Sequence, residues 1–366
     1  MALHELVDDF AAAHLCPTVA WGVVTDGELI ECHSPDTVYR IASMTKSFTC
    51  AAVLALRDEG VLSLDLPVSE YAPELAAVRG PLDSPPITLR HLMSMQAGLA
   101  TDDPWADRHL DISASDIDTI YAAAPAFAAV TGTTYEYSNL GFGMIGRVVQ
   151  RATGMRVQQH ISERFLSPLG MHRSTWVEPS HTDWARPFRV QDGASVPDPH
   201  HPIGDGEIAP MGGLWTTVRD LARWVTFLNA ANGHSASHHE VLSAASRREM
   251  QMVHTHIGRS VLGGRNGTAG YGFGVRTFDD DELGMNLAHS GGVPGYGTNM
   301  RWLHHGRFTA NVGAIALANT TYAPTAHLTM QMLASVAPQL TRRTVDTTLL
   351  VERARQLVAL IDDWSD

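Results

Sequence analysis

The sequence predicts an α+β fold in which one antiparallel sheet, built from both ends of the chain, receives a mostly helical insertion. Strand patterns occur near the start of the chain and again after about residue 270, whereas helical patterns and Pro- and Gly-rich loops occupy the middle. The 366 residues are 44% hydrophobic and 18% charged, enough to bury a large core. We expect a sheet domain from residues 1–65 and 266–366 and a helical insertion domain from residues 66–265.

The first elements are a helix and a hairpin. In residues 1–10 the apolar and polar side chains are spaced as in an amphipathic helix. Two strand-like segments, 18–24 and 28–32, flank Asp26-Gly27, a dipeptide that suits the tight turn of a β-hairpin. The chain therefore begins with a helix and two antiparallel strands.

A buried helix is predicted next, from Ser43 through Leu56, because this segment is apolar nearly all round and ends near Gly60. Further helical patterns follow in the middle of the chain, at residues 89–95, 140–152 and 221–228.

Strand patterns return at residues 271–276, 297–302 and 308–317, and helices are expected from about Thr325 and over 347–364. An isolated two-stranded hairpin is only marginally stable in water. The early hairpin is therefore expected to join the late strands in a single sheet.

Composition excludes several classes of function. The formal charge of −13, without a basic patch, argues against nucleic-acid binding. No apolar run approaches the roughly 18 to 20 residues that cross a bilayer, and the start of the chain lacks the features of a secretory signal. We therefore expect a cytoplasmic protein without membrane contacts; no sequence feature decides its oligomeric state. Cys16, Cys32 and Cys50 lack paired spacing and are expected to be buried free thiols.

Lys46 is the single lysine among 26 basic residues, and the other 25 are arginines. An arginine stays protonated in any protein environment, whereas a buried lysine can lose its proton. Ser43 lies three residues before Lys46, which places both side chains on one helical face. Burial would lower the pKa of Lys46, so that the neutral amine could accept the serine proton. The alternative is a helix-capping serine beside a lysine that extends to solvent.

Two further motifs carry groups suited to acyl chemistry. In Tyr137-Ser138-Asn139, at a loop-to-helix junction, the pKa of the Tyr137 phenol is expected to fall beside a cationic amine; the alternative is a half-buried tyrosine beside an asparagine cap. In His289-Ser290-Gly291-Gly292, the N–H groups of Gly292 and Ser43 could form an oxyanion hole; the alternative is a glycine-rich hairpin with a surface histidine.

In this order and spacing the three motifs resemble the signature of the serine β-lactamase and penicillin-binding protein superfamily. The closest branch holds class C β-lactamases, D-Ala-D-Ala carboxypeptidases, D-aminopeptidases and related esterases. The resemblance covers about residues 1–340. Four supporting segments are also similar to the family: 39–42, 64–68, 87–92 and 212–214.

The resemblance implies a β-lactamase-like fold, with helices flanking the sheet and an active site between the two domains. Ser43 would form an acyl-enzyme while Lys46 and Tyr137 move protons. The substrate would be a small acyl compound, and neither a cofactor nor a metal is implied. The residues implied to bind the substrate are Asn139, His289, Ser290, Gly291 and Tyr296.

Three other segments are candidates to border the cleft. The proline-rich stretch 172–211 is too long for a simple connection. The acidic segment 102–107 and Trp215 could line the cleft or serve as packing anchors.

The third motif departs from the pattern, because His289 stands where many members carry lysine. Histidine is mostly neutral at pH 7 and gives no permanent positive charge for a substrate carboxylate. We therefore expect weak activity on β-lactams and better activity on small esters, amides or D-residue peptides.

Other functions remain alternatives. The same acyl-enzyme could serve an acyltransferase, and the scaffold could bind ligands as a non-catalytic sensor. The 19 histidines suggest a metal-dependent hydrolase, but no His-Glu-x-x-His motif is present. A Gly-x-Ser-x-Gly motif is also absent, which disfavours an α/β-hydrolase.

Overall fold

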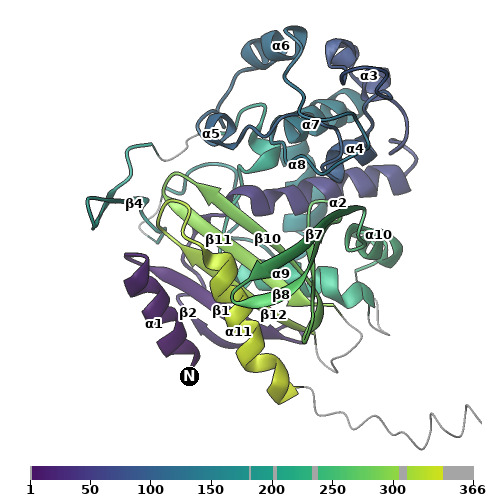
Figure 1. The fold of residues 1–366 in the computed structure, drawn as a ribbon. Helices are drawn as coiled ribbons and strands as arrows, with labels where there is room; N and C mark the ends of the chain where they lie inside the picture. Colours follow the sequence, from purple (N-terminus) through teal and green to yellow (C-terminus); the bar gives the residue numbers. More distant parts are fainter. Residues whose placement is uncertain (1, 181–182, 201–203, 233–237, 305–310, 341–366) are drawn as a thin grey trace, which may run out of the picture.

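An eight-stranded antiparallel sheet forms the centre of the molecule (Figure 1). The computed structural model describes residues 2–180, 183–200, 204–232, 238–304 and 311–340. The sheet order is β2-β1-β12-β11-β10-β9-β8-β7. Its strands are β1 (Val19–Thr25), β2 (Glu28–His33), β7 (Thr255–Leu262), β8 (Arg265–Tyr271), β9 (Arg276–Asp280), β10 (Gly284–Val293), β11 (Tyr296–Leu303) and β12 (Val312–Ala318). Two small pairs lie outside it: β3 (Tyr39–Arg40) with β6 (Trp215–Thr216), and β4 (Phe188–Gln191) with β5 (Ala194–Pro197).

The N-terminal hairpin joins the late strands, as predicted. Val19 lies opposite Ala318 and Thr25 opposite Val312, so β1 pairs with β12 along its whole length. The hairpin turn holds Asp26 and Gly27 with φ of 49° and 94°, the left-handed conformations that a tight hairpin turn requires. These pairings confirm the predicted α+β class.

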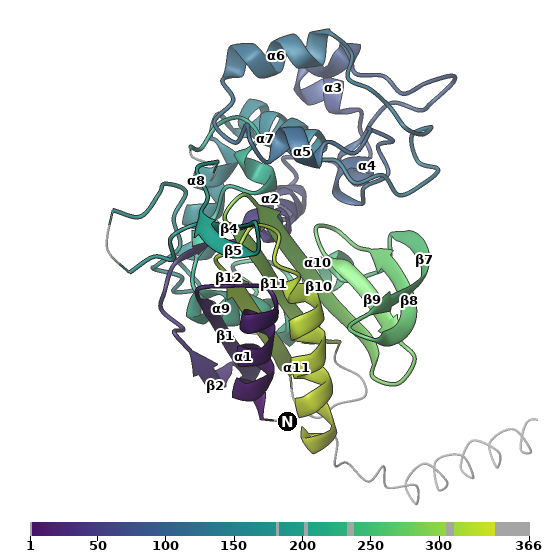
Figure 2. The same ribbon diagram turned by 60° about the vertical axis from the view of Figure 1, so that its left-hand side comes forward.

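Helices cover both faces of the sheet. The helices α1 (Leu3–Ala13) and α11 (Thr325–Leu340) lie side by side on one face (Figures 1 and 2), where Trp21 and Val23 of β1 pack with them. The alternate residues of β1, Ala20 and Val24, belong to the core on the other face. The helix α9 (Val218–Asn229) packs there against β1, β11 and β12.

The helix α2 (Thr45–Asp58) lies between the sheet and a group of helices, and it is buried from Thr45 to Leu56. Figure 2 shows the helical group on the side of α2 away from the sheet. The predicted helices around 43–56, 140–152, 221–228 and from 325 are confirmed. The described residues contain no helix that is both long and apolar enough to cross a membrane. The helical group comprises α3 (Val68–Tyr71), α4 (Leu89–Met93), α5 (Asp103–Ala106), α6 (Ala114–Ala122), α7 (Leu140–Thr153) and α8 (Val157–Ile161), and α10 (Ala244–Met250) lies beside α2.

The predicted strand 271–276 is wrong, because β8 ends at Tyr271 and β9 begins at Arg276. The bend between them passes close to α2: Gly274 has φ of 67°, and a Cβ there would lie 2.5 Å from the carbonyl oxygen of Lys46. The predicted strand 308–317 is observed from Val312. Its residues 308–310 and the predicted helix 347–364 lie outside the described residues.

The division into a sheet domain and a helical insertion remains a proposal, and the structure suggests where to place its boundary. Both α9 and β7 belong with the sheet, although they fall within residues 66–265. We therefore propose that the helical insertion ends near β6, before α9.

All three cysteines are free. Cys16 and Cys50 are buried, as predicted, whereas Cys32 is only half-buried on the edge strand β2.

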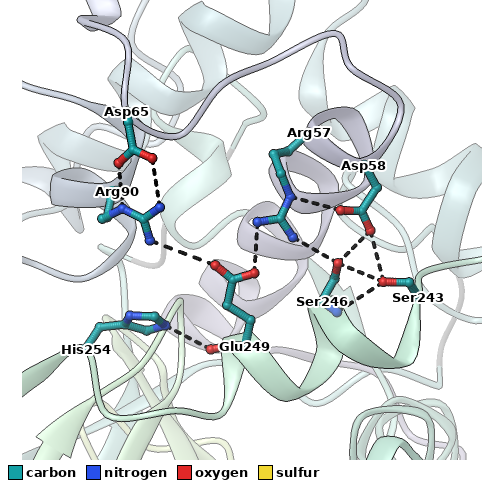
Figure 3. Close-up of polar contacts among 8 residues, drawn as sticks. All are labelled: Arg57, Asp58, Asp65, Arg90, Ser243, Ser246, Glu249 and His254. Atoms are coloured by element: carbon teal, nitrogen blue, oxygen red, sulfur yellow. Dashed lines mark hydrogen bonds and ion pairs between the residues drawn. The ribbon is translucent and has the colours of Figure 1, made fainter.

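A polar network connects the end of α2 with α10 and α4 (Figure 3). The carboxylate of Glu249 lies 2.8 Å from Arg57 and 3.8 Å from Arg90, which also pairs with Asp65 at 2.7 Å. The carbonyl oxygen of Glu249 lies 2.9 Å from His254 Nε2. Glu249 of α10 thus contacts residues of both α2 and α4.

Replacing Glu249 with glutamine is expected to lower the free energy of unfolding by about 1 kcal/mol, because two arginines lose their shared counterion in a partly buried network. Urea denaturation followed by tryptophan fluorescence measures this loss, which should shrink at high salt. The matched control is Glu31→Gln on exposed β2. Equal destabilisation by both changes would contradict a specific role for the network.

Candidate active site

Ser43 lies just before α2, in the short helix η1 (Ala42–Met44). The backbone before it is held from two sides: the Ile41 N–H donates to the Leu214 carbonyl, and Thr298 donates to the Ile41 carbonyl, both at 3.0 Å. Ala42 has φ of 48°, a left-handed conformation that costs a non-glycine residue about 1 kcal/mol. The surrounding contacts thus impose the direction in which Ser43 points.

Lys46 is fully buried behind Ser43. Its Nζ donates to Ser43 Oγ at 2.9 Å, to Asn139 Oδ1 at 2.7 Å and to the Met211 carbonyl at 2.9 Å. The alternative of a lysine extending to solvent is therefore wrong. Burial lowers the pKa of Lys46 to about 8, as predicted in direction, although nearby carboxylates oppose the shift.

Tyr137 comes from the loop before α7, and it lines the same cavity as Ser43. The predicted fall in the pKa of Tyr137 is wrong: desolvation raises it well above the usual value. Lys46 Nζ lies over the aromatic ring, 4.9 Å from its centroid. Tyr137 therefore keeps its proton at neutral pH.

The third motif reaches the site because β10 approaches the Ser43 backbone without side chains between them. A Cβ on Gly291 would lie 2.0 Å from the Ile41 carbonyl oxygen, so only glycine fits. Gly292 and Ser43 line the same cavity. Ser290 also lines it, and its Oγ accepts a hydrogen bond from Asn299 Nδ2 at 2.8 Å.

His289 is buried and neutral, not a surface histidine. Its Nδ1 lies 2.7 Å from the Ser290 carbonyl oxygen, which can only accept, so Nδ1 carries the proton. Its Nε2 then accepts from the Tyr271 hydroxyl at 3.0 Å. Burial first, and the charge of Lys46 second, lower the pKa of His289 well below its usual value.

Tyr296 does not lie where the sequence placed it. Its side chain is fully buried, and its hydroxyl donates to the Ala185 carbonyl at 2.8 Å. Trp215 is also fully buried and packs edge-on against Tyr296. Both residues therefore support the core beneath the site and do not contact the substrate cavity.

A cavity of about 500 Å³ opens onto Ser43. The predicted residues that line it are Ser43, Tyr137, His289, Ser290 and Gly292, whereas Asn139 and Lys46 lie behind them. Its other lining residues are Asp103, Pro104, Asp107, Arg108, Arg276 and Tyr322.

Arg276 and Tyr322 had no signal in the sequence. Arg276 is the first residue of β9, with its guanidinium 5.8 Å from the ring centroid of Tyr137, and nothing marks it among 25 arginines. Tyr322 follows β12 and donates to Asp107 Oδ2 at 2.7 Å, which links the sheet to the helical part across the cavity. Burial raises the pKa of Asp107 to about 7.

Within the part of the chain that the structure describes, no three His, Cys, Asp or Glu side chains are grouped so that they could hold a metal ion. The proline-rich stretch 172–211 contributes to the site through its last residue, because the Met211 carbonyl accepts a hydrogen bond from Lys46 Nζ.

Comparisons with known proteins agree with this geometry. The family model described as Beta-lactamase matches residues 3–337. Esterase EstB of Burkholderia gladioli is 28% identical over 291 residues, 70% of this chain and 71% of EstB. The D-alanyl-D-alanine-carboxypeptidase/endopeptidase AmpH of Escherichia coli (strain K12) is 31% identical over 194 residues, 52% of this chain and 48% of AmpH.

The fold also matches a solved structure, the octameric penicillin-binding protein homologue from Pyrococcus abyssi, with a TM-score of 0.75 and 22% identity over 93% of this chain and 78% of that one. The chain covers between 36% and 71% of the lengths of the first curated relatives. Because the family model matches nearly the whole chain, the protein belongs to the Beta-lactamase family, in agreement with the three motifs.

Proposed function

We propose that the protein is a serine hydrolase that forms an acyl-enzyme on Ser43. The observation that carries the proposal is the 2.9 Å contact between the buried Lys46 amine and Ser43 Oγ at the floor of an open cavity. A serine hydroxyl is a weak nucleophile until a neighbouring base takes its proton. Lys46 is placed to be that base.

The pKa values support a division of roles between Lys46 and Tyr137. Lys46, with a pKa of about 8, has a neutral fraction at physiological pH, whereas Tyr137 stays protonated. In the proposed reaction Ser43 Oγ bonds to the acyl carbon and its proton passes to Lys46 Nζ. The leaving group then takes a proton from Tyr137 or from Lys46, and water later releases the acyl group by the reverse route.

The oxyanion would bind between the backbone N–H groups of Ser43 and Gly292, which line one cavity. We propose small esters, amides or D-residue peptides as substrates. The names of EstB and AmpH, an esterase and a D-alanyl-D-alanine carboxypeptidase, support these classes.

Weak activity on β-lactams is proposed because His289 is neutral and its ring nitrogens are engaged with Tyr271 and Ser290. Arg276 is the other cation beside Tyr137, and it provides a second place where a substrate carboxylate could bind. Arg276→Gln therefore belongs in the test: it should lower activity on carboxylate-bearing substrates and spare uncharged esters.

The decisive experiment is a panel of p-nitrophenyl esters, D-amino-acid amides and nitrocefin, with mass spectrometry to locate the acyl group. We expect turnover of esters or D-residue amides, weak turnover of nitrocefin, and the acyl group on Ser43. Comparable rates on nitrocefin and a short ester would contradict the substrate class. A fluorophosphonate that never labels Ser43 would contradict the acyl-enzyme and favour a non-catalytic binder.

The rate of acylation is expected to rise with pH through about 8 and then to level off, because the neutral fraction of Lys46 grows as pH passes its pKa. Tyr137 and His289 do not change the rate between about pH 7 and pH 9 by titrating, since Tyr137 stays protonated and His289 stays neutral. Measuring kcat/KM against pH tests this. A rate that falls between about pH 7 and pH 9 would exclude Lys46 as the base.

A further inference from the structure

The side chain of Asn139 is free to serve the site because a neighbour caps its helix. Asn139 occupies the N-cap position of α7, yet its side chain makes no capping hydrogen bond. The Asp102 carboxylate instead accepts from the backbone N–H groups of Asn139 and Leu140, both at 2.8 Å. A carboxylate is favourable at a helix N-terminus. The Asn139 amide can therefore make other contacts.

The freed amide connects Asp103 with Lys46. Asn139 Nδ2 donates to Asp103 Oδ1 at 2.6 Å, and more weakly to Asp102 Oδ1 at 3.2 Å, while Asn139 Oδ1 accepts from Lys46 at 2.7 Å. A carboxylate only accepts and an ammonium only donates, so these partners fix which way the amide faces. A continuous chain of hydrogen bonds thus runs from Asp103 through Asn139 and Lys46 to Ser43.

We propose that Asp103 is a positioning residue that holds Lys46 against Ser43 through Asn139 and sets the pH at which the amine becomes a base. The inference rests on the proposed role of Lys46. Asp103 acts in two ways. Its hydrogen bond orients Asn139, and its negative charge, on the wall of the cavity, stabilises the protonated amine.

Other groups also face Lys46 and must be separated from Asp103. Asp107 and Asp102 flank α5 and also favour the ammonium form. Asp107 titrates near pH 7, so its charge changes in the same range. Cys50 on α2, Tyr137 before α7 and His289 on β10 stay uncharged near neutral pH, since burial shifts each pKa toward the neutral form.

The single lysine makes a direct measurement possible. Protein labelled with carbon-13 at the lysine Cε gives one lysine signal, and its pH titration reports the pKa of Lys46 without turnover. Asp103→Asn removes the charge but leaves an oxygen that can accept from Asn139. We expect the pKa of Lys46 to fall by about half a unit to one unit. Asp103→Ala removes the anchor as well, so the plateau rate of fluorophosphonate labelling of Ser43 should fall about tenfold.

Asp107→Asn is the matched comparison, because it removes a nearby charge without touching Asn139. It should lower the pKa of Lys46 while Asn139 stays anchored, and because Asp107 lines the cavity this variant is compared by the lysine titration alone. A Lys46 pKa unchanged by Asp103→Asn would overturn the proposal, and so would a full plateau rate in a folded Asp103→Ala protein. Failure of the unaltered protein to label contradicts the proposed function instead, and the lysine titration still decides whether Asp103 controls Lys46.

Discussion

Replacing Ser43 with alanine is expected to lower kcat/KM on the best ester or amide by on the order of 10⁴-fold, because Ser43 Oγ is the hydroxyl that the Lys46 amine contacts. The fold should persist. Ser43 is a small side chain that lines the cavity, and the backbone around it is held by Ile41, Leu214 and Thr298. Steady-state kinetics and mass spectrometry of trapped enzyme measure the loss of activity and of the acyl adduct.

Ser47→Ala is the matched control for that experiment. Ser47 lies one turn further along α2, is fully buried, and accepts from Trp224 Nε1 at 3.0 Å. Its loss should cost about 1 kcal/mol of stability and leave the acyl-enzyme intact. An adduct that persists in Ser43→Ala, or that disappears equally in Ser47→Ala, would refute Ser43 as the nucleophile.

Removing the amine of Lys46 is expected to have the second largest effect, a loss of about 10³-fold in kcat/KM. Lys46→Met keeps the length of the side chain without a base. Lys46→Arg keeps a positive charge but cannot release its proton at any pH that the protein survives. Both should lose the rise of activity through about pH 8 that the pKa of Lys46 produces.

The two Lys46 variants control for each other. Lys46→Met leaves Asn139 Oδ1 and the Met211 carbonyl without their donor, whereas Lys46→Arg still offers donors but demands more space. Circular dichroism verifies that each variant is folded. If the folded arginine variant kept most of the activity, then charge alone would suffice and Lys46 would not be the base.

The contact between Ser43 and Lys46 could be predicted from the sequence because its geometry is local. A spacing of three on a buried helix places Ser43 beside Lys46 whatever the rest of the chain does. The single lysine drew attention to the same position. Tyr137, Asn139 and His289 reach the site only through tertiary structure, and the resemblance to a known family supplied their roles.

Other features were beyond the sequence because they depend on distant packing. Tyr296 stands close to the third motif in sequence, but it begins β11 and points into the core, where it donates to Ala185. Arg276 reaches the cavity only because the bend around Gly274 lets β9 start there. The direction of the Tyr137 pKa shift was also unpredictable, since it depends on how completely tertiary packing buries the phenol.

The three acceptors around Lys46 have a further consequence for the chemical step. The Asn139 and Met211 oxygens still receive two N–H groups when the amine is neutral, and its lone pair then points at the Ser43 hydroxyl. A proton passing between Ser43 Oγ and Lys46 Nζ would therefore leave these two acceptors in place. Under the proposed mechanism, the polar surroundings would therefore reorganise little when Lys46 takes the Ser43 proton, whereas water would have to reorient to do the same.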